Sequence, residues 1–128
     1  VLSGMSTMEQ VLDNISYMKD FKPLSKEEQN TIKEAQKALD AIESIPCTAC
    51  RYCTPGCPMG IEIPDIFKAM NWYKIYSMKD KAKDRYESTV QKSAKASECI
   101  ECGQCEGVCP QQLPIIKYLK ECADELEE

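Results

Sequence analysis

The sequence predicts an all-α fold with two cysteine loops, and three observations lead to this fold class. Apolar residues recur at helical spacing along most of the chain, and after the first few residues no segment shows the alternation typical of a strand. One cysteine spacing, C-x2-C-x2-C-x3-C followed by Pro, occurs at residues 47–58 and again at 99–110. With 128 residues, 29% of them charged and 43% hydrophobic, the chain suits one globular domain of ordinary size.

The N-terminal residues predict a short strand followed by an amphipathic helix. Residues 1–3 are expected to end a buried strand, and Ser6 and Glu9 have the spacing of a capping box that starts a helix over 7–19. The apolar residues of this helix share one face: Met8, Val11, Leu12, Ile15 and Met18. Because a lone strand and helix bury little surface, residues 1–22 are interpreted as the last β-α unit of a larger protein.

Residues 23–128 are expected to form a second domain, which is helical. Ser25 and Glu28 have the spacing of another capping box, and they begin a helix that ends before Ile45. The apolar face of this helix consists of Ile32, Ala35, Leu39 and Ile42.

Three later stretches of this second domain are also predicted to be helical. Pro64 suits the first turn of a helix that has Ile66, Met70 and Tyr73 along one side. Residues 79–97 have few apolar anchors and predict a more exposed helix or two. Pro114 begins a last helix, whose inward face is expected to hold Ile115, Leu119, Cys122 and Leu126.

The eight cysteines of the two runs are interpreted as ligands of iron–sulfur clusters. Two intervening residues let a loop wrap three thiolates around three corners of a cubane, and the Pro after the fourth cysteine turns the chain away. The spacing resembles that of bacterial-type dicluster ferredoxins, in which the fourth cysteine of each run binds the other cluster. The resemblance implies two 4Fe–4S clusters, one on Cys47, Cys50, Cys53 and Cys109 and the other on Cys57, Cys99, Cys102 and Cys105.

Structural zinc is the alternative for these cysteines, because C-x2-C pairs are also a zinc spacing. A zinc site requires neither the third cysteine three residues on nor the Pro, and two identical four-cysteine runs favour iron–sulfur chemistry. The chain has no His, which excludes Rieske ligation and two-Cys–two-His zinc sites from this chain alone. Cys122, the ninth cysteine, lies on an apolar helix face and is expected to pack in the core.

The charge and hydropathy of the chain indicate its location in the cell and the kinds of partner it can bind. The first residues show no signal-peptide pattern, and no run approaches the ~18 apolar residues of a spanning helix. Clustered thiols are then typical of a reducing compartment, so a cytoplasmic location without a membrane partner is expected. A formal net charge of -5 argues against nucleic acid as a partner and would steer the domain toward basic patches on a redox partner.

The stretch between the two cysteine runs indicates which kind of ferredoxin fold the chain resembles. In the small two-cluster ferredoxins this link is short and contains β-structure, whereas here it is about twice as long and has helical periodicity. The chain therefore resembles the α-helical ferredoxin fold. The iron–sulfur subunits of succinate dehydrogenase and fumarate reductase have this fold, as does the N-terminal domain of dihydropyrimidine dehydrogenase.

Residues 1–14, 45–64 and 98–115 together resemble the C-terminal part of an iron–sulfur-containing aldo/keto reductase. The first stretch resembles the last strand, turn and helix of the reductase barrel, and the other two resemble its ferredoxin-like extension. In that family this turn and helix hold the adenosine end of NADPH. The resemblance therefore implies NAD(P)H in the intact parent protein, near Gly4, Met5, Gln10, Asp13 and Asn14. The family's catalytic Asp, Tyr, Lys and His belong to earlier strands, so this chain is not expected to be the reductase by itself.

These features favour electron transfer as the function. Two 4Fe–4S clusters would pass single electrons between a redox partner protein and an adjoining reductase domain. The alternative is a structural iron–sulfur domain that shapes the reductase pocket or a subunit interface. Aromatic residues at helical spacing are expected to pack in the core rather than form an electron relay or docking patch: Trp72, Tyr73 and Tyr76.

Overall fold

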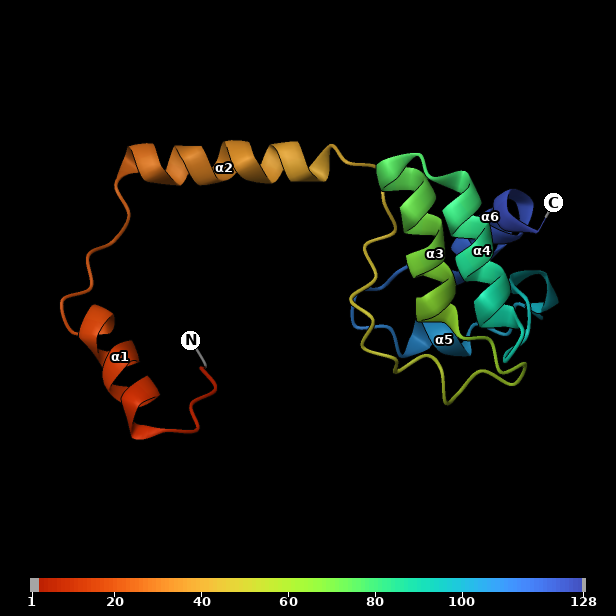
Figure 1. Ribbon diagram of the computed structural model, residues 1–128, viewed down its shortest axis with the longest axis horizontal. Coiled ribbons are helices and arrows are strands. Elements are labelled where there is room, and N and C mark those ends of the chain that lie inside the picture. The colour runs from red at the N-terminus through yellow and green to blue at the C-terminus, as the bar shows by residue number, and fades with distance from the viewer. Residues whose placement is uncertain (1–2, 128) are drawn as a thin grey trace. The chain divides into compact units, whose positions relative to one another are not determined.

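The computed structural model describes residues 3–127, in which every regular element is a helix (Figure 1). The elements are α1 (Met8–Met18), α2 (Lys26–Asp40), α3 (Ile63–Tyr76), α4 (Lys79–Val90), the short 3-10 helix η1 (Ala96–Glu98), α5 (Gln104–Gly107) and α6 (Ile115–Leu126). The predicted all-α class is confirmed for these residues. The strand expected at residues 1–3 falls mainly on residues 1 and 2, outside the described residues, and Ser3 has no regular structure. Within residues 3–127, no helix combines the length and the hydropathy of a membrane-spanning segment.

Packing divides the chain into two compact units, Val1–Ala41 and Ile42–Glu128. The first unit contains α1 and α2, and the second contains the other helices and both cysteine loops. The domain boundary expected between residues 22 and 23 stays a prediction. It separates segments by their resemblance to other proteins, whereas the division after Ala41 reflects only how the chain packs.

Helix α1 begins with a capping box that lies one residue later than predicted. The pair predicted from sequence, Ser6 and Glu9, is wrong. Instead Thr7 Oγ1 accepts from Gln10 N at 3.3 Å, and Gln10 Oε1 accepts from Thr7 N at 3.2 Å. Gln10 Oε1 also accepts from Ser6 N at 2.7 Å, so one side chain satisfies two backbone donors before the helix.

Helix α2 begins with the predicted capping box of Ser25 and Glu28. Ser25 Oγ accepts from Glu28 N at 3.2 Å, and Glu28 Oε2 accepts from Ser25 N at 2.7 Å. These hydrogen bonds hold the pKa of Glu28 below its ordinary value. The helix ends at Asp40, so Ile42 lies outside the apolar face that was expected to include it. Neither α1 nor α2 buries a residue.

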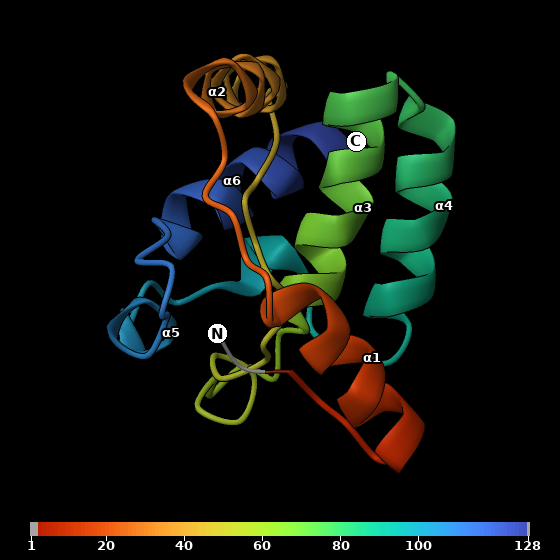
Figure 2. The same cartoon turned by 90° about the vertical axis from the view of Figure 1, so that its left-hand side faces the viewer.

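The second unit has a hydrophobic core between its three long helices. Helix α3 packs against α4 and α6, and α3 and α4 lie side by side in Figures 1 and 2. Helix α6 also contacts α5 and η1. It buries the four residues that the sequence predicts, Ile115, Leu119, Cys122 and Leu126. Burial raises the pKa of the Cys122 thiol to about 12, as expected of a packed, uncharged side chain.

One expectation about the long helices needs correction. Residues 79–97 do form the expected more exposed helices, α4 and η1, in which only Ala82, Tyr86 and Ala96 are buried. Of the aromatic residues expected in the core, Trp72 and Tyr73 are half-buried against it, whereas Tyr76 is 60% exposed. The Tyr76 ring lies against the Trp72 ring, with 5.6 Å between their centroids.

Tyr86 joins α4 to two later segments through its hydroxyl. The hydroxyl donates to the Glu127 carboxylate and accepts from Ala96 N at 2.8 Å. Ser97 donates to the same carboxylate, from its N at 3.0 Å and its Oγ at 2.6 Å. Burial and the neighbouring carboxylate raise the pKa of Tyr86. Burial also disfavours the charge on Glu127, but the hydrogen bonds from Ser97 and Tyr86 outweigh it and lower the pKa of Glu127.

Replacing Tyr86 by Phe should lower the free energy of unfolding by about 1–3 kcal/mol, since the buried N–H of Ala96 and the Glu127 carboxylate would each lose a partner. Urea unfolding of protein purified without oxygen measures the change. The matched control is Tyr76→Phe, which removes a hydroxyl from an exposed side chain and should change stability by less than about 0.5 kcal/mol.

The same network should give stability a pH dependence of defined sign. Because the folded chain lowers the pKa of Glu127 below its ordinary value of 4.5, the contribution is complete above that pH. It is lost as the pH falls through the lowered pKa. The stability difference between the wild type and Glu127→Gln should therefore shrink below about pH 4.5. A difference that grows on acidification would contradict the network.

Candidate metal centres

The two cysteine loops share three backbone turns, although only the second loop contains a helix, α5. Each loop forms the same three turns, with nearly the same N–O distances of 3.0–3.2 Å. In the first loop the hydrogen bonds run from Thr54 N to Arg51 O, from Cys57 N to Thr54 O and from Gly60 N to Cys57 O. The equivalent bonds of the second loop run from Glu106 N to Gly103 O, from Cys109 N to Glu106 O and from Gln112 N to Cys109 O. The repeat in the sequence is therefore a repeat in the backbone.

Left-handed residues bend both loops at equivalent positions. Their φ angles lie between 51° and 75°, at Ala49, Arg51 and Gly60 in the first loop and at Glu101, Gly103 and Gln112 in the second. A residue with a Cβ pays about 1 kcal/mol or more for this conformation, and only two of these residues are Gly. Such strain persists where the surrounding structure enforces it, which is typical of binding sites.

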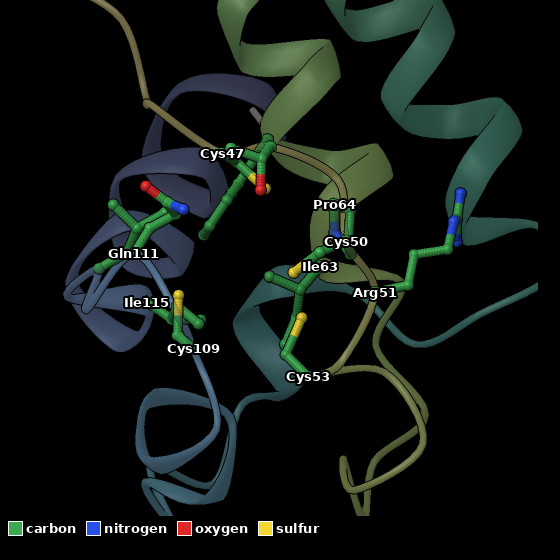
Figure 3. Close-up of a pocket in the computed structure, with 12 residues that line it drawn as sticks. Cys47, Cys50, Arg51, Cys53, Ile63, Pro64, Cys109, Gln111 and Ile115 are labelled. Atoms are coloured by element: carbon green, nitrogen blue, oxygen red, sulfur yellow. The ribbon is translucent and has the colours of Figure 1, made fainter. Parts of the chain in front are cut away.

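The first cavity is lined by three cysteines of one loop and the last cysteine of the other. Figure 3 shows Cys109 facing Cys50 and Cys53 across this space. We call the four cysteines the first set: Cys47, Cys50, Cys53 and Cys109. The walls around them are mainly apolar, from Ile63, Pro64, Phe67, Leu113 and Ile115.

The second cavity repeats this arrangement with the loops exchanged. Its cysteines form the second set: Cys57, Cys99, Cys102 and Cys105. Its walls are again apolar, from Pro58, Met59, Ile61, Ile63, Ile100, Ile116 and Leu119. Ile63 lines both cavities, so its side chain lies between the two sets. The structure thus brings the eight cysteines together in the two crossed groups that the resemblance implies.

Exposure differs in the same way within both sets. Cys50 and Cys102 are exposed, whereas Cys53 and Cys105 are buried, each with 8% of its surface accessible. Burial raises the pKa of the Cys53 thiol and raises that of Cys105 to about 11. Free thiolates are therefore disfavoured at these two positions, and a bound cation would be needed to hold them.

The chemistry of the donors and walls fits an iron–sulfur cluster. Each cavity offers four thiols in mainly apolar surroundings. Thr54 Oγ1, next to Cys53 in the chain, is the one buried side-chain polar atom of residues 3–127 that has no hydrogen-bond partner. A cluster would supply sulfur acceptors for such a hydroxyl. No three His, Cys, Asp or Glu side chains in the described residues stand in the arrangement of a single-ion site.

Arg51 fastens the first loop to the start of α3, a contact that sequence reasoning did not identify. Its guanidinium pairs with Asp65 Oδ2 at 2.8 Å and with Glu62 Oε2 at 2.9 Å, and Figure 3 shows the side chain extending away from the cavity. The hydrogen bond to Asp65, followed by the pairing with Glu62, raises the pKa of Arg51. Because all three side chains are partly exposed, water screens both pairs and each contributes little to stability.

The residues that the resemblance assigns to a nucleotide lie in the first unit, away from both loops in the sequence. Four of them are exposed, namely Gly4, Met5, Gln10 and Asp13, and Asn14 is half-buried. Gln10 is engaged in the capping box of α1. Asn14 Oδ1 accepts from the Tyr17 hydroxyl at 2.7 Å, and Asn14 Nδ2 donates to Ser3 Oγ at 3.4 Å. Nucleotide binding at these residues stays a prediction.

Two curated proteins are similar to much of the chain. One belongs to the ion-translocating oxidoreductase complex of Buchnera aphidicola; it is 28% identical over 87 residues, which cover 68% of this chain and 16% of that protein. The other is the probable glycolate oxidase iron–sulfur subunit of Bacillus subtilis. It is 30% identical over 103 residues, which cover 80% of this chain and 22% of that protein. The chain therefore spans less than a quarter of the length of either relative.

The family comparison covers both cysteine loops and the helices between them. Residues 46–114 match the 4Fe-4S dicluster domain, whereas no solved structure matches the chain significantly. The matched region is more than half of the 128 residues and contains both crossed cysteine sets. The chain belongs to the 4Fe-4S dicluster domain family, whose members are ferredoxin-like iron–sulfur domains.

Proposed function

We propose that the chain transfers electrons through two 4Fe–4S clusters, as a module of a larger oxidoreductase. The first set would hold one cluster and the second set the other. The observation that carries the proposal is the crossing itself, because each cavity combines three cysteines of one loop with the fourth cysteine of the other. That arrangement matches the ligand exchange of dicluster ferredoxins.

The positions of three residues support a path through the domain. Ile63 lines both cavities, so the two clusters would be separated at that point by one apolar side chain. Cys50 and Cys102 are exposed, one in each set, so each cluster would have an edge near solvent. An electron could therefore enter at one exposed cysteine and leave at the other.

The surrounding residues would set the properties of the clusters. Apolar walls exclude water and lower the local dielectric, which strengthens the effect of every nearby charge or hydrogen bond. Backbone N–H groups of the loops that face the sulfurs would stabilise the more negative, reduced state. The chain's residues thus hold, insulate and tune the clusters, while the clusters would supply the one-electron chemistry.

The larger context comes from the relatives. Both are named as parts of oxidoreductases, and this chain is similar to only a small part of each. We therefore propose a redox partner protein or an adjoining oxidoreductase domain as the source or destination of the electrons. The net charge of -5 favours a partner surface with basic residues.

Chain purified without oxygen should contain about eight iron atoms and about eight sulfides, for two clusters of four each. Stepwise reduction by dithionite should give reversible EPR signals, with magnetic interaction between the clusters because they lie on either side of Ile63. Intact clusters that resist reduction would instead favour the structural alternative. Zinc in place of iron would overturn the proposal.

A pair of double variants tests the crossing directly. Replacing Cys57 and Cys102 by Ala removes two ligands of the second set only, so about four iron atoms should remain. The matched variant, with Cys50 and Cys57 replaced, removes two cysteines of one loop but one ligand from each set. It should therefore damage both clusters.

Uncrossed ligation predicts the opposite iron contents for these two variants. If each loop held its own cluster, the Cys50 and Cys57 variant would keep one intact cluster and the Cys57 and Cys102 variant would damage two. Circular dichroism of both proteins shows whether the helices persist, so that loss of iron is not confused with loss of the fold.

The finer context that we propose is an aldo/keto reductase, and it rests on the resemblance of residues 1–14 to the end of the reductase barrel. In that case the intact protein should bind NAD(P)H near Gly4 and Met5. The full-length gene product should then contain an aldo/keto reductase barrel before this chain, with its catalytic Asp, Tyr, Lys and His. A different upstream domain would overturn this context and leave the electron-transfer proposal standing.

A further inference from the structure

Thr54 and Glu106 occupy the same place in the two matching loops. Each directly follows the third cysteine of its loop, Cys53 or Cys105. Thr54 N donates to Arg51 O and Glu106 N to the equivalent Gly103 O. Their carbonyl groups accept from the fourth cysteine of the same loop, at 3.2 Å in both cases. The backbone around the two cavities is therefore matched, and these side chains are a chemical difference between them.

The Thr54 side chain presents a neutral donor beside the first set. Its Oγ1 is buried, has no partner within full hydrogen-bond geometry in the described chain, and lies close enough to the Cys53 thiol to act against the rise in that thiol's pKa. A buried hydroxyl that donates to nothing is destabilising, because it has lost its hydrogen bonds to water. The adjacent Cys53 lines the first cavity. A sulfur in that cavity is the acceptor that would satisfy the hydroxyl.

The Glu106 side chain presents a carboxylate beside the second set. Glu106 Oε1 accepts from Ile116 N at 2.9 Å, and both residues are half-buried. Ile116 and the adjacent Cys105 line the second cavity. An ionised carboxylate is only an acceptor, so it offers the sulfurs no hydrogen bond and brings a negative charge to partly desolvated surroundings.

We propose that Thr54 and Glu106 make the two clusters unequal, so that a single electron rests on the cluster of the first set. Reduction adds one negative charge to a cluster, with no bond broken. A hydroxyl donor favours that added charge, and a nearby carboxylate disfavours it. Electrons from an external one-electron donor would then collect at the first set before leaving for an acceptor. This inference rests on the proposed electron-transfer function.

The test is a redox titration of the full chain, followed by EPR. Thr54→Val keeps the shape of the side chain and removes the hydroxyl, so it should lower the higher potential. Thr54→Ser retains a hydroxyl and should leave the higher potential close to its wild-type value. Glu106→Gln keeps an acceptor for Ile116 N without the charge and should raise the lower potential. Each change should shift the electron distribution about three- to tenfold, where tenfold corresponds to about 59 mV for one electron.

The two potentials can be assigned with the Cys57 and Cys102 double variant, which retains only the first set. The matched charge control is Glu87→Gln on α4, because this exposed carboxylate lines neither cavity and should shift neither potential measurably. The inference would be overturned if the cluster of the first set had a lower potential than that of the second set, or if neither potential responded to Thr54→Val and Glu106→Gln. The electron-transfer proposal would still stand in either case. Absence of reducible clusters would overturn the proposed function itself.

Discussion

The exchange of one cysteine between two loops is the constraint on which the rest of the second unit depends. Cys57 lies in the cavity of the second loop and Cys109 in that of the first, although α3, α4 and η1 separate the two loops along the chain. Neither cavity is complete until these helices have folded and brought the loops together. Core residues of α3 and α6, such as Ile63 and Ile115, are also cavity walls. Cluster binding and packing of the core would therefore be one event.

Local patterns were enough to predict much of this arrangement. The buried face of α6 follows from four apolar positions at helical spacing, and the capping box of α2 follows from Ser25 and Glu28. The grouping of the cysteines follows from a repeated spacing with a known ligand exchange. Each of these features depends on residues close together in the sequence, or on a motif whose long-range consequence is already understood.

The features that the sequence did not reveal depend on competition or on distant partners. At α1 two overlapping patterns, Ser6 with Glu9 and Thr7 with Gln10, satisfy the same capping rule, and only the folded backbone selects the second. Tyr86 can be buried in the core because its hydroxyl finds partners in Ala96 N and the Glu127 carboxylate, neither of which a helical period can indicate. The left-handed Ala49 likewise belongs to a loop whose path is set by the site rather than by residue preference.

The repeated turns make side chains an important source of differences between the two centres. Matching turns and left-handed positions give both cavities nearly the same frame, so backbone dipoles alone would leave the two sets alike. The crossing makes each loop contribute to both cavities, because Cys53 and Cys57 of one loop line different ones. A change in loop path would therefore disturb both centres together. A side chain such as Thr54 or Glu106 can change the properties of one centre without changing the path of the loop. Two loops of similar backbone can therefore hold clusters of different potential, and that difference gives electron transfer between them a direction.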